Sequence, residues 1–175
     1  MTTVMTILAA MCLMAGPALA ERTDGEVIDD AGLHAQMKTN MVASDVVDAN
    51  DVNIEVDKGV VQLSGFVDSE AARDEAGRIA ADIIGVKSVS NKLAIKGADR
   101  SLGTVAKDQY IETKVDAALI ADEMTDAGDI DVDVRNGVVQ LSGFVGTDAE
   151  KQRATEVAMG IEGVTRVDNV LDLKN

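Results

Sequence analysis

Residues 59–67 read GVVQLSGFV, and the same nine letters return at residues 137–145. The 17-residue windows that end with these two blocks agree at 11 positions, and the offset of 78 continues without gaps on both sides. A match of this length indicates a duplicated structural unit. We therefore expect two copies joined by a short linker, with the first copy at residues 31–96, the linker at 97–108 and the second copy at 109–174.

Each copy begins with a predicted helix and a hairpin. Apolar residues four apart, Leu33, Met37 and Met41, indicate the helix in the first copy. Apolar and polar residues then alternate on both sides of a two-residue turn, Lys58-Gly59 in the first copy and Asn136-Gly137 in the second. Asn-Gly favours such a turn because both of its positions take a positive φ.

The two-residue turn also sets the register of the hairpin. It pairs Val56 with Val61 and Ile54 with Leu63, which places four apolar side chains on one face. A second helix and a last strand follow, with apolar positions at Ala76, Ile79, Ala80, Ile83, Val89, Leu93 and Ile95. The order α-β-β-α-β predicts an α+β fold in which each copy is a three-stranded sheet with two helices on one face.

The sequence also marks the ends of the second helix. Thr147 and Glu150 have the spacing of a capping box at its start in the second copy. Two glycines with positive φ are expected to close this helix in the two copies, Gly85 and Gly163. Two asparagines interrupt the inward row of the last strand and are expected to hydrogen-bond to nearby backbone, Asn91 and Asn169.

Composition excludes several classes of function. The chain has 175 residues, of which 31 are acidic and 16 basic, so its formal charge of −15 argues against a nucleic-acid partner. One His and one Cys are too few for a zinc site. That histidine, His34, follows the apolar position Leu33 on the first helix, so we expect it to face solvent and to have no catalytic role.

The N-terminal residues 1–20 are predicted to be a signal peptide. From Val4 to Ala20 the chain is uncharged, and it ends with Ala18-Leu19-Ala20, which fits cleavage before Glu21. The apolar run is shorter than the roughly 20 residues of a membrane-spanning helix. The residues before Cys12 do not fit a lipoprotein signal. We therefore expect export to the periplasm without a lipid anchor or a transmembrane segment in the mature chain.

With these elements in place, the repeated unit resembles the BON domain of exported bacterial proteins. The resemblance rests on the alternating Val residues, on G-V-V-x-L-x-G-x-V and on G-V-x-x-V-x-N-x-L after the second helix, in both copies. A signal peptide with two such domains is similar to the osmotically induced periplasmic proteins of Gram-negative bacteria. The resemblance implies no enzyme activity and no cofactor, phospholipid binding, and a role in envelope integrity under osmotic stress. The motif glycines, for which we expect structural roles, are Gly59, Gly65, Gly85, Gly137, Gly143 and Gly163.

An acidic segment of the second hairpin starts like a calcium-binding loop. Asp129, Asp131 and Asp133 have the D-x-D-x-D spacing, but Val134 stands where that loop needs Gly and Gln140 where it needs Glu. Strand alternation explains the apolar residues between them. We predict that the three carboxylates line a solvent-exposed strand face, with weak divalent-ion association as the alternative.

The two phenylalanines fall out of phase with the apolar face. Alternation places Phe66 and Phe144 on the face opposite the helices. We expect bulges at Gly65 and Gly143 to rotate the rings back into the core. The alternative is that the rings form an exposed apolar surface available for domain packing or a partner.

Two functions from different classes remain. The first is an envelope-stress protein that associates weakly with phospholipid head groups, and the second is a periplasmic protein-interaction or chaperone-like module for exported proteins. The basic segment expected to contact head groups contains Lys92, Lys96, Arg100 and Lys107. A second candidate is a helix edge around Tyr110 and Lys114.

Overall fold

The computed structural model describes residues 29–97 and 100–174, which form two α+β domains that match the two copies. The signal peptide prediction lies outside these residues. The first domain consists of α1 (Asp30–Val42), β1 (Val52–Asp57), β2 (Val60–Val67), α2 (Glu70–Ala81), β3 (Ser88–Asn91) and β4 (Ala94–Ile95). The second consists of α3 (Leu102–Ala121), β5 (Ile130–Arg135), β6 (Val138–Val145), α4 (Asp148–Met159), β7 (Arg166–Asn169) and β8 (Asp172–Leu173).

The hairpins have the predicted register. Val56 pairs with Val61 and Ile54 with Leu63 in the antiparallel pair β1–β2, and β5–β6 repeats this register in the second domain. Both turn residues have positive φ: Lys58 at 50° and Gly59 at 82°, with corresponding values in the Asn-Gly turn of the second domain. The local turn chemistry therefore determines which face of each hairpin is apolar.

The last strand of each domain is divided, which the alternation pattern did not predict. β3 and β4 both run parallel to β2, but the chain leaves the strand between them. The Asn91 side chain causes the break: its Nδ2 donates to the Arg73 carbonyl at 2.8 Å, and its Oδ1 accepts from the Leu93 amide at 3.2 Å. Asn169 makes the equivalent backbone contacts in the second domain, so both asparagines bind backbone as expected.

The helices cover one face of each sheet, where the predicted apolar stripes are buried. Leu33, Met37 and Met41 of α1 pack against the sheet residues Ile54 and Leu63. Burying a side chain of this size contributes about 1.5–3 kcal/mol. One inward prediction is wrong: Ile95 is 40% exposed, and its counterpart in β8 is similarly exposed, because both lie at the end of the short last strand.

The ends of the helices differ in detail from the sequence prediction. The Glu150 amide donates to Thr147 Oγ1 at 3.1 Å, as in a capping box. The Glu150 carboxylate, however, accepts from the Gly146 and Asp126 amides rather than from Thr147. Gly163 has the expected positive φ of 98°, but it lies beyond the end of α4, in the turn that leads to β7. α3 also starts inside the segment expected to be a linker.

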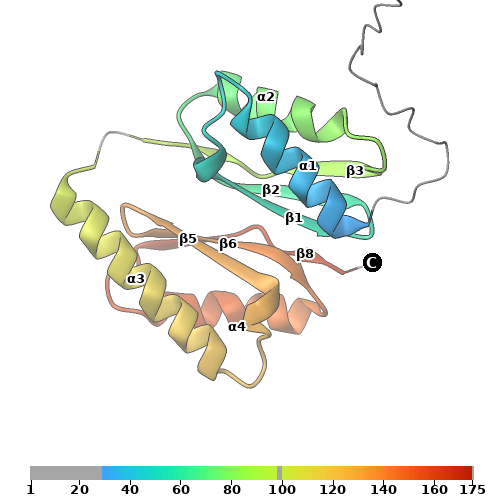
Figure 1. Cartoon of the computed structure of the whole chain (residues 1–175). Helices are drawn as coiled ribbons and strands as arrows, with labels where there is room; N and C mark the ends of the chain where they lie inside the picture. Colours follow the sequence, from blue (N-terminus) through green and yellow to red (C-terminus); the bar gives the residue numbers. More distant parts are fainter. Residues whose placement is uncertain (1–28, 98–99, 175) are drawn as a thin grey trace, which may run out of the picture.

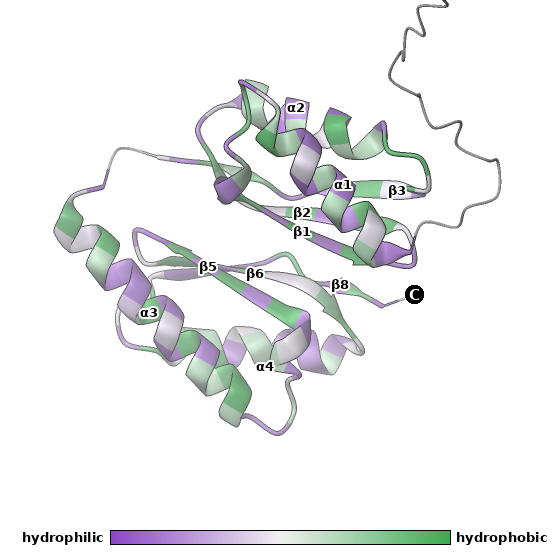
Figure 2. Cartoon of the chain, viewed as in Figure 1, coloured by the Kyte–Doolittle hydropathy of each residue, from purple (hydrophilic) through white to green (hydrophobic). Residues whose placement is uncertain are grey.

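The two sheets face each other between the two pairs of helices. Figure 1 shows four layers, with α1 and α2 on one outer side, α3 and α4 on the other, and the sheets between them. Contacts join β2 with β6 and β1 with β6. Figure 2 shows polar and apolar residues alternating along β5, because this strand packs its helices on one face and meets the other domain with the opposite face.

Candidate functional site

The surface between the domains is polar and buried. Gln62 and Ser64 of β2, with Gln140 and Ser142 of β6, are each at most 2% exposed. The two serine hydroxyls lie 2.8 Å apart. Sequence alternation assigned these side chains to a polar outer face, and the structure shows that the other domain covers this face.

The glutamines exchange hydrogen bonds symmetrically between the domains. Gln62 Oε1 accepts from the Gly143 amide at 2.7 Å, and Gln140 Oε1 accepts from the Gly65 amide at 2.6 Å. The Gln62 amide group also donates to the Val170 carbonyl at 2.8 Å. Buried polar groups that are satisfied in this way hold two surfaces in one register.

Glycine is required at the centre of this exchange. Gly65 has a φ of 109°, and a Cβ there would lie 2.3 Å from the Asp51 carbonyl oxygen. Gly143 has a φ of 118°, and a Cβ there would lie 2.1 Å from the Asp129 carbonyl oxygen. Any side chain at these positions would therefore clash with the neighbouring strand.

The phenylalanines lie on the interdomain side, so the expected rotation into the core is wrong. The register of β1–β2 runs one to one as far as Gly65, without an inserted residue. Phe144 is buried but does not belong to the apolar core of its domain. Phe66 is half-buried and lines a cavity of about 190 Å³ together with Lys96 and Arg100. The rings serve domain packing, which was the alternative interpretation.

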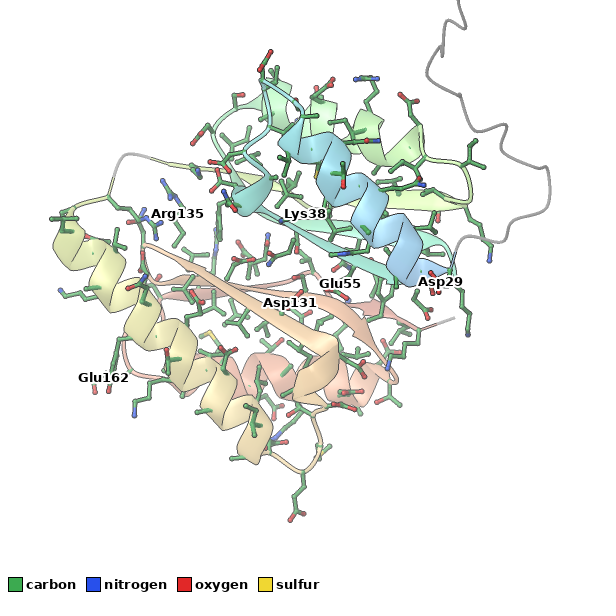
Figure 3. All side chains as sticks on the ribbon, in the orientation of Figure 1. Asp29, Lys38, Glu55, Asp131, Arg135 and Glu162 are labelled. Atoms are coloured by element: carbon green, nitrogen blue, oxygen red, sulfur yellow. The ribbon has the colours of Figure 1, made fainter. Side chains whose placement is uncertain are left out.

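The acidic strand residues are also half-buried between the domains, which corrects the prediction of a solvent-exposed face. Asp133 Oδ2 accepts from Asn53 Nδ2 at 2.7 Å. Burial, followed by repulsion from nearby carboxylates, raises the pKa of Asp133 to about 6. Burial and a hydrogen bond with Asp131 raise the pKa of Glu55 to about 7. Figure 3 shows Glu55 and Asp131 in the layer between the two sheets.

The four basic residues expected to contact lipid do not act as one free patch. Lys96 forms ion pairs with Asp51 at 2.5 Å and Asp68 at 3.0 Å. Arg100 forms an ion pair with the buried Asp108 at 2.8 Å. The other two, Lys92 and Lys107, are exposed, and their side chains form no ion pair within the described residues.

Sequence reasoning missed an aspartate that holds each hairpin turn. In the first domain, the Asp30 carboxylate accepts from the turn amides of Lys58 at 2.7 Å and Gly59 at 2.8 Å. Asp108 binds the corresponding turn amides at 2.9 and 3.0 Å and additionally pairs with Arg100. Asp30 and Asp108 are identical residues 78 positions apart, and this identity was the signal in the sequence for a shared role.

The exposed edge of α3 carries mixed apolar and basic character. Tyr110 is 60% exposed, and the Lys114 ammonium lies 5.4 Å from the centre of its ring, within range of a cation–π contact. Lys107 and Tyr110 border a cavity of about 820 Å³ between α3, the second hairpin turn and the loop after α4. Leu102 at the start of the same helix is 90% exposed.

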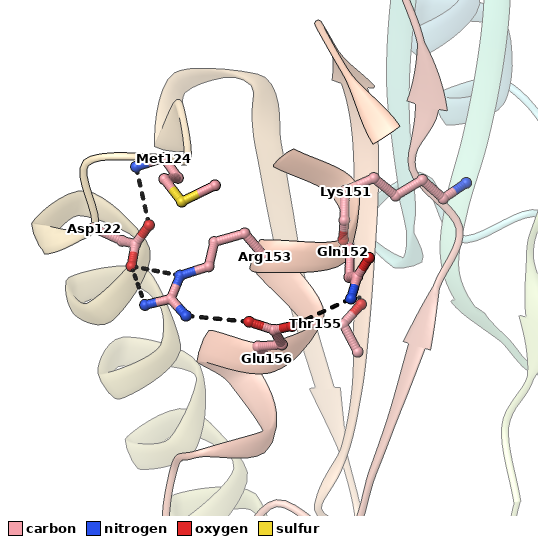
Figure 4. A network of polar contacts seen from close by, with 7 residues as sticks. All are labelled: Asp122, Met124, Lys151, Gln152, Arg153, Thr155 and Glu156. Carbon is pink, nitrogen blue, oxygen red and sulfur yellow. Dashed lines mark hydrogen bonds and ion pairs between the residues drawn. The ribbon is translucent and has the colours of Figure 1, made fainter. Parts of the chain in front are cut away.

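A polar network joins the two helices of the second domain (Figure 4). Arg153 of α4 donates to Asp122 Oδ2 through Nε at 2.9 Å and Nη2 at 2.7 Å. Asp122 also accepts from the Met124 amide at 3.0 Å, directly after α3. The pKa of the Asp122 carboxyl is lowered mainly by its hydrogen bond with Arg153. The network therefore fixes the end of α3 against α4.

The described residues contain no group of three or more His, Cys, Asp or Glu side chains arranged as metal ligands. His34 is exposed on α1, as expected. None of the helices within residues 29–97 and 100–174 has the length and apolarity needed to cross a bilayer.

A family model and two curated relatives show similarity to this chain. The model of the BON domain matches residues 29–97 and 107–175. Osmotically-inducible protein Y of Escherichia coli is 36% identical over 151 residues, which are 86% of this chain and 75% of that protein. Outer membrane lipoprotein DolP of Haemophilus influenzae is 29% identical over 168 residues, which are 95% of this chain and 86% of that protein.

Proposed function

The chain belongs to the BON-domain family, with two tandem copies, and from this premise we propose that it is a non-enzymatic periplasmic protein that supports the bacterial envelope under osmotic stress and associates weakly with phospholipid head groups. The names of the two relatives, one osmotically inducible and one an outer membrane lipoprotein, support the envelope setting. The lipid contact is supported by the α3 edge of the second domain.

The observation that carries the lipid contact is the exposed Tyr110–Lys114 pair beside Lys107. An aromatic ring with a polar tip is suited to the boundary between head groups and acyl chains, and an adjacent ammonium group can approach a phosphate. Lys92 is exposed and contributes to the proposal, whereas the ion pairs of Lys96 and Arg100 reduce the charge that these two residues offer to a membrane.

The net charge limits the strength of this association. A chain with a formal charge of −15 is repelled on average by anionic bilayers. Screening over about 8–10 Å at physiological salt weakens this repulsion without creating attraction. Each basic residue near an anionic surface contributes only about 1 kcal/mol. Binding is therefore local, salt-sensitive and in the micromolar range or weaker.

Co-sedimentation with phosphatidylglycerol vesicles at several salt concentrations tests the proposal. The triple variant Lys107→Glu/Tyr110→Ser/Lys114→Glu is expected to abolish sedimentation of the protein with the vesicles. The set Lys92→Glu, Lys96→Glu, Arg100→Glu and Lys107→Glu is expected to weaken it. Arg78→Glu with Arg166→Glu, at exposed positions of α2 and β7, makes the same charge change as the α3 replacements away from α3 and is the matched control. Tight, salt-insensitive binding that survives the α3 replacements would contradict the proposal.

A chaperone-like role is the second candidate, and it is favoured by apolar residues exposed at equivalent positions in both domains. Val42 is the last residue of α1, and Val46 lies in the loop after it. Their counterparts are Ile120, in the last turn of α3, and Met124, in the loop after that helix; each of the four is more than half exposed. Two copies of one apolar surface could hold an unfolded exported chain at two points. This role predicts that the protein suppresses aggregation of a denatured outer-membrane protein and that Val46→Ser with Met124→Ser removes the effect.

Export remains a prediction that mass spectrometry can test. The intact mass of protein from the periplasm is expected to correspond to residues 21–175 without acylation. A chain that retains Met1, or one that carries fatty acyl groups, would contradict cleavage after Ala20.

A further inference from the structure

The first domain contains a lysine that binds backbone oxygens. Lys38 of α1 donates its ammonium hydrogens to the Ala49 carbonyl at 2.5 Å and to the Val52 carbonyl at 3.2 Å. Ala49 starts the short 3-10 helix Ala49–Asp51, and Val52 starts β1. The two carbonyl oxygens therefore form a cradle for a cation where the chain enters the hairpin.

The second domain repeats the backbone of this cradle. Its 3-10 helix is Ala127–Asp129. Asp126, which precedes this helix, has φ and ψ of −95° and 97°, and Asp48, which precedes the 3-10 helix of the first domain, has −78° and 109°. The residue that follows, Ile130, has −125° and 115°, against −120° and 116° for Val52. The Ala127 and Ile130 carbonyls thus correspond, in the repeat, to the two carbonyls that bind the ammonium group in the first domain.

The side chain above this second cradle is an acid. Asp116 of α3 stands at the position of Lys38, 78 residues later. α3 packs along β5 as α1 packs along β1. An aspartate oxygen is two bonds closer to its Cα than a lysine nitrogen is. The Asp116 oxygen therefore ends roughly 2.5 Å short of the place that a lysine ammonium group would take, and this gap matches Ca²⁺–oxygen distances of about 2.3–2.6 Å.

Asp116 lies at an exposed position of α3 beside a second carboxylate, that of Asp131. Partial burial of its carboxyl group raises the pKa of Asp116, and the nearby Asp131 carboxylate raises it further. In the described part of the chain, Asp116 forms no ion pair with a lysine or arginine. A cation at the cradle would relieve this repulsion, just as the Lys38 ammonium group supplies a positive charge in the first domain.

We propose that the second domain binds one Ca²⁺ ion through the Ala127 and Ile130 carbonyl oxygens, the Asp116 carboxylate and water. Carbonyl and carboxylate oxygens in irregular geometry suit Ca²⁺, whereas Mg²⁺ demands a near-ideal octahedron and retains its waters. With one directly bound carboxylate the site is weak, with a Kd of about 10⁻⁴–10⁻³ M, the range of extracellular calcium modules. The ligands differ from the D-x-D-x-D interpretation of the sequence, since Asp129 and Asp133 take no part.

A titration with CaCl₂ at constant ionic strength tests the site in the full chain. NMR amide shifts are expected to saturate at Ala127–Ile130 and Asp116 with one ion bound, and MgCl₂ is expected to produce smaller shifts. Asp116→Lys is expected to abolish the calcium response, because its ammonium group fills the cradle as Lys38 does. Asp45→Asn, which removes an exposed acid of the first domain, is the matched control and is expected to leave the shifts unchanged.

The reverse substitution is designed to create a site. Lys38→Asp gives the first domain the same ligand set, so the number of bound calcium ions is expected to rise from one to two. If that variant fails to fold, Asp116→Asn provides a second test and is expected to weaken binding at least tenfold. The proposal is overturned if calcium leaves the Ala127–Ile130 amides unshifted in the unaltered chain, or if Asp116→Lys responds as the unaltered chain does.

Discussion

The two domains have the same backbone fold and equivalent apolar cores, but the polar contacts within each domain differ. Within the described residues, Asp30 binds only its hairpin turn, whereas Asp108 binds the equivalent turn and also Arg100. Arg153 ties the end of α3 to α4, and the corresponding position in the first domain is Glu75. The repeat therefore preserves the contacts that the fold requires, and we expect the polar contacts that differ between the copies to set the stability of each copy.

The contact common to both domains should respond equally in both. Gly65→Ala and Gly143→Ala each force a side chain into a positive-φ position against a backbone oxygen. We expect a loss of about 3 kcal/mol of unfolding free energy for each variant. Urea unfolding followed by circular dichroism measures both. A loss of unfolding free energy in only one variant would show that the two glycine positions are not equivalent.

The contact between the aspartate and the hairpin turn is more deeply buried in the second domain, so its removal should have unequal effects in the two domains. Asp108→Ala leaves two turn amides and Arg100 without their acceptor in a buried place, and we expect a loss of about 3 kcal/mol. Asp30→Ala removes the same turn contact at a more exposed position and should cost about 1 kcal/mol. Tyr110, the single tyrosine, reports fluorescence from the second domain. Equal losses of unfolding free energy in the two variants would contradict a stronger turn contact in the second domain.

The interdomain carboxylates should make stability fall as the pH rises. The folded pKa values of Glu55 and Asp133, about 7 and about 6, lie above their ordinary values of 4.5 and 3.8. Stability from their protonated forms is complete below about pH 4 and is lost as the pH rises through 6 and 7. Because both groups keep some contact with water, we expect a loss of about 1–2 kcal/mol between pH 5 and 8. Glu55→Gln with Asp133→Asn should flatten this profile in urea titrations at both pH values.

The smallest effect is expected from Arg153→Ala. The variant releases Asp122 and Glu156 at a surface that is partly exposed to water. The urea midpoint of the second domain should fall by less than half of the fall caused by Asp108→Ala, and the first domain should be unchanged. Tyr110 fluorescence and circular dichroism separate the two domains; a larger fall than for Asp108→Ala would reverse the assigned order of contacts.

Most of the fold of each copy follows from the sequence. The repeat predicted two copies of one unit, the Asn136-Gly137 turn predicted the hairpin register, and the spacing of Leu33, Met37 and Met41 predicted the buried helix face. The division of the last strand was missed because the apolar positions keep the same phase before and after Asn91, and only the hydrogen bonds of its side chain show that the chain leaves the sheet there.

The surface between the domains was beyond sequence reasoning for a physical reason. Gln62 and Ser64 alternate with apolar residues just as they would on a strand face covered by water. Polar side chains that pair across two sheets and polar side chains that bind water leave the same pattern. Ion pairing also escaped the pattern, since the carboxylates that bind Lys96 and Arg100 lie in other parts of the chain.

The buried hydrogen bonds between the domains require the two sheets to face each other in solution, and cysteine cross-linking tests this directly. The Ser64 and Ser142 hydroxyls lie 2.8 Å apart, which is compatible with a disulfide. In a Cys12→Ser background, oxidised Ser64→Cys/Ser142→Cys is expected to form an intramolecular disulfide in nearly every molecule. Ser64→Cys/Thr113→Cys, with its second cysteine on the exposed side of α3, is expected to form none. Equal cross-linking of both pairs, or of neither in folded protein, would contradict the packing described above.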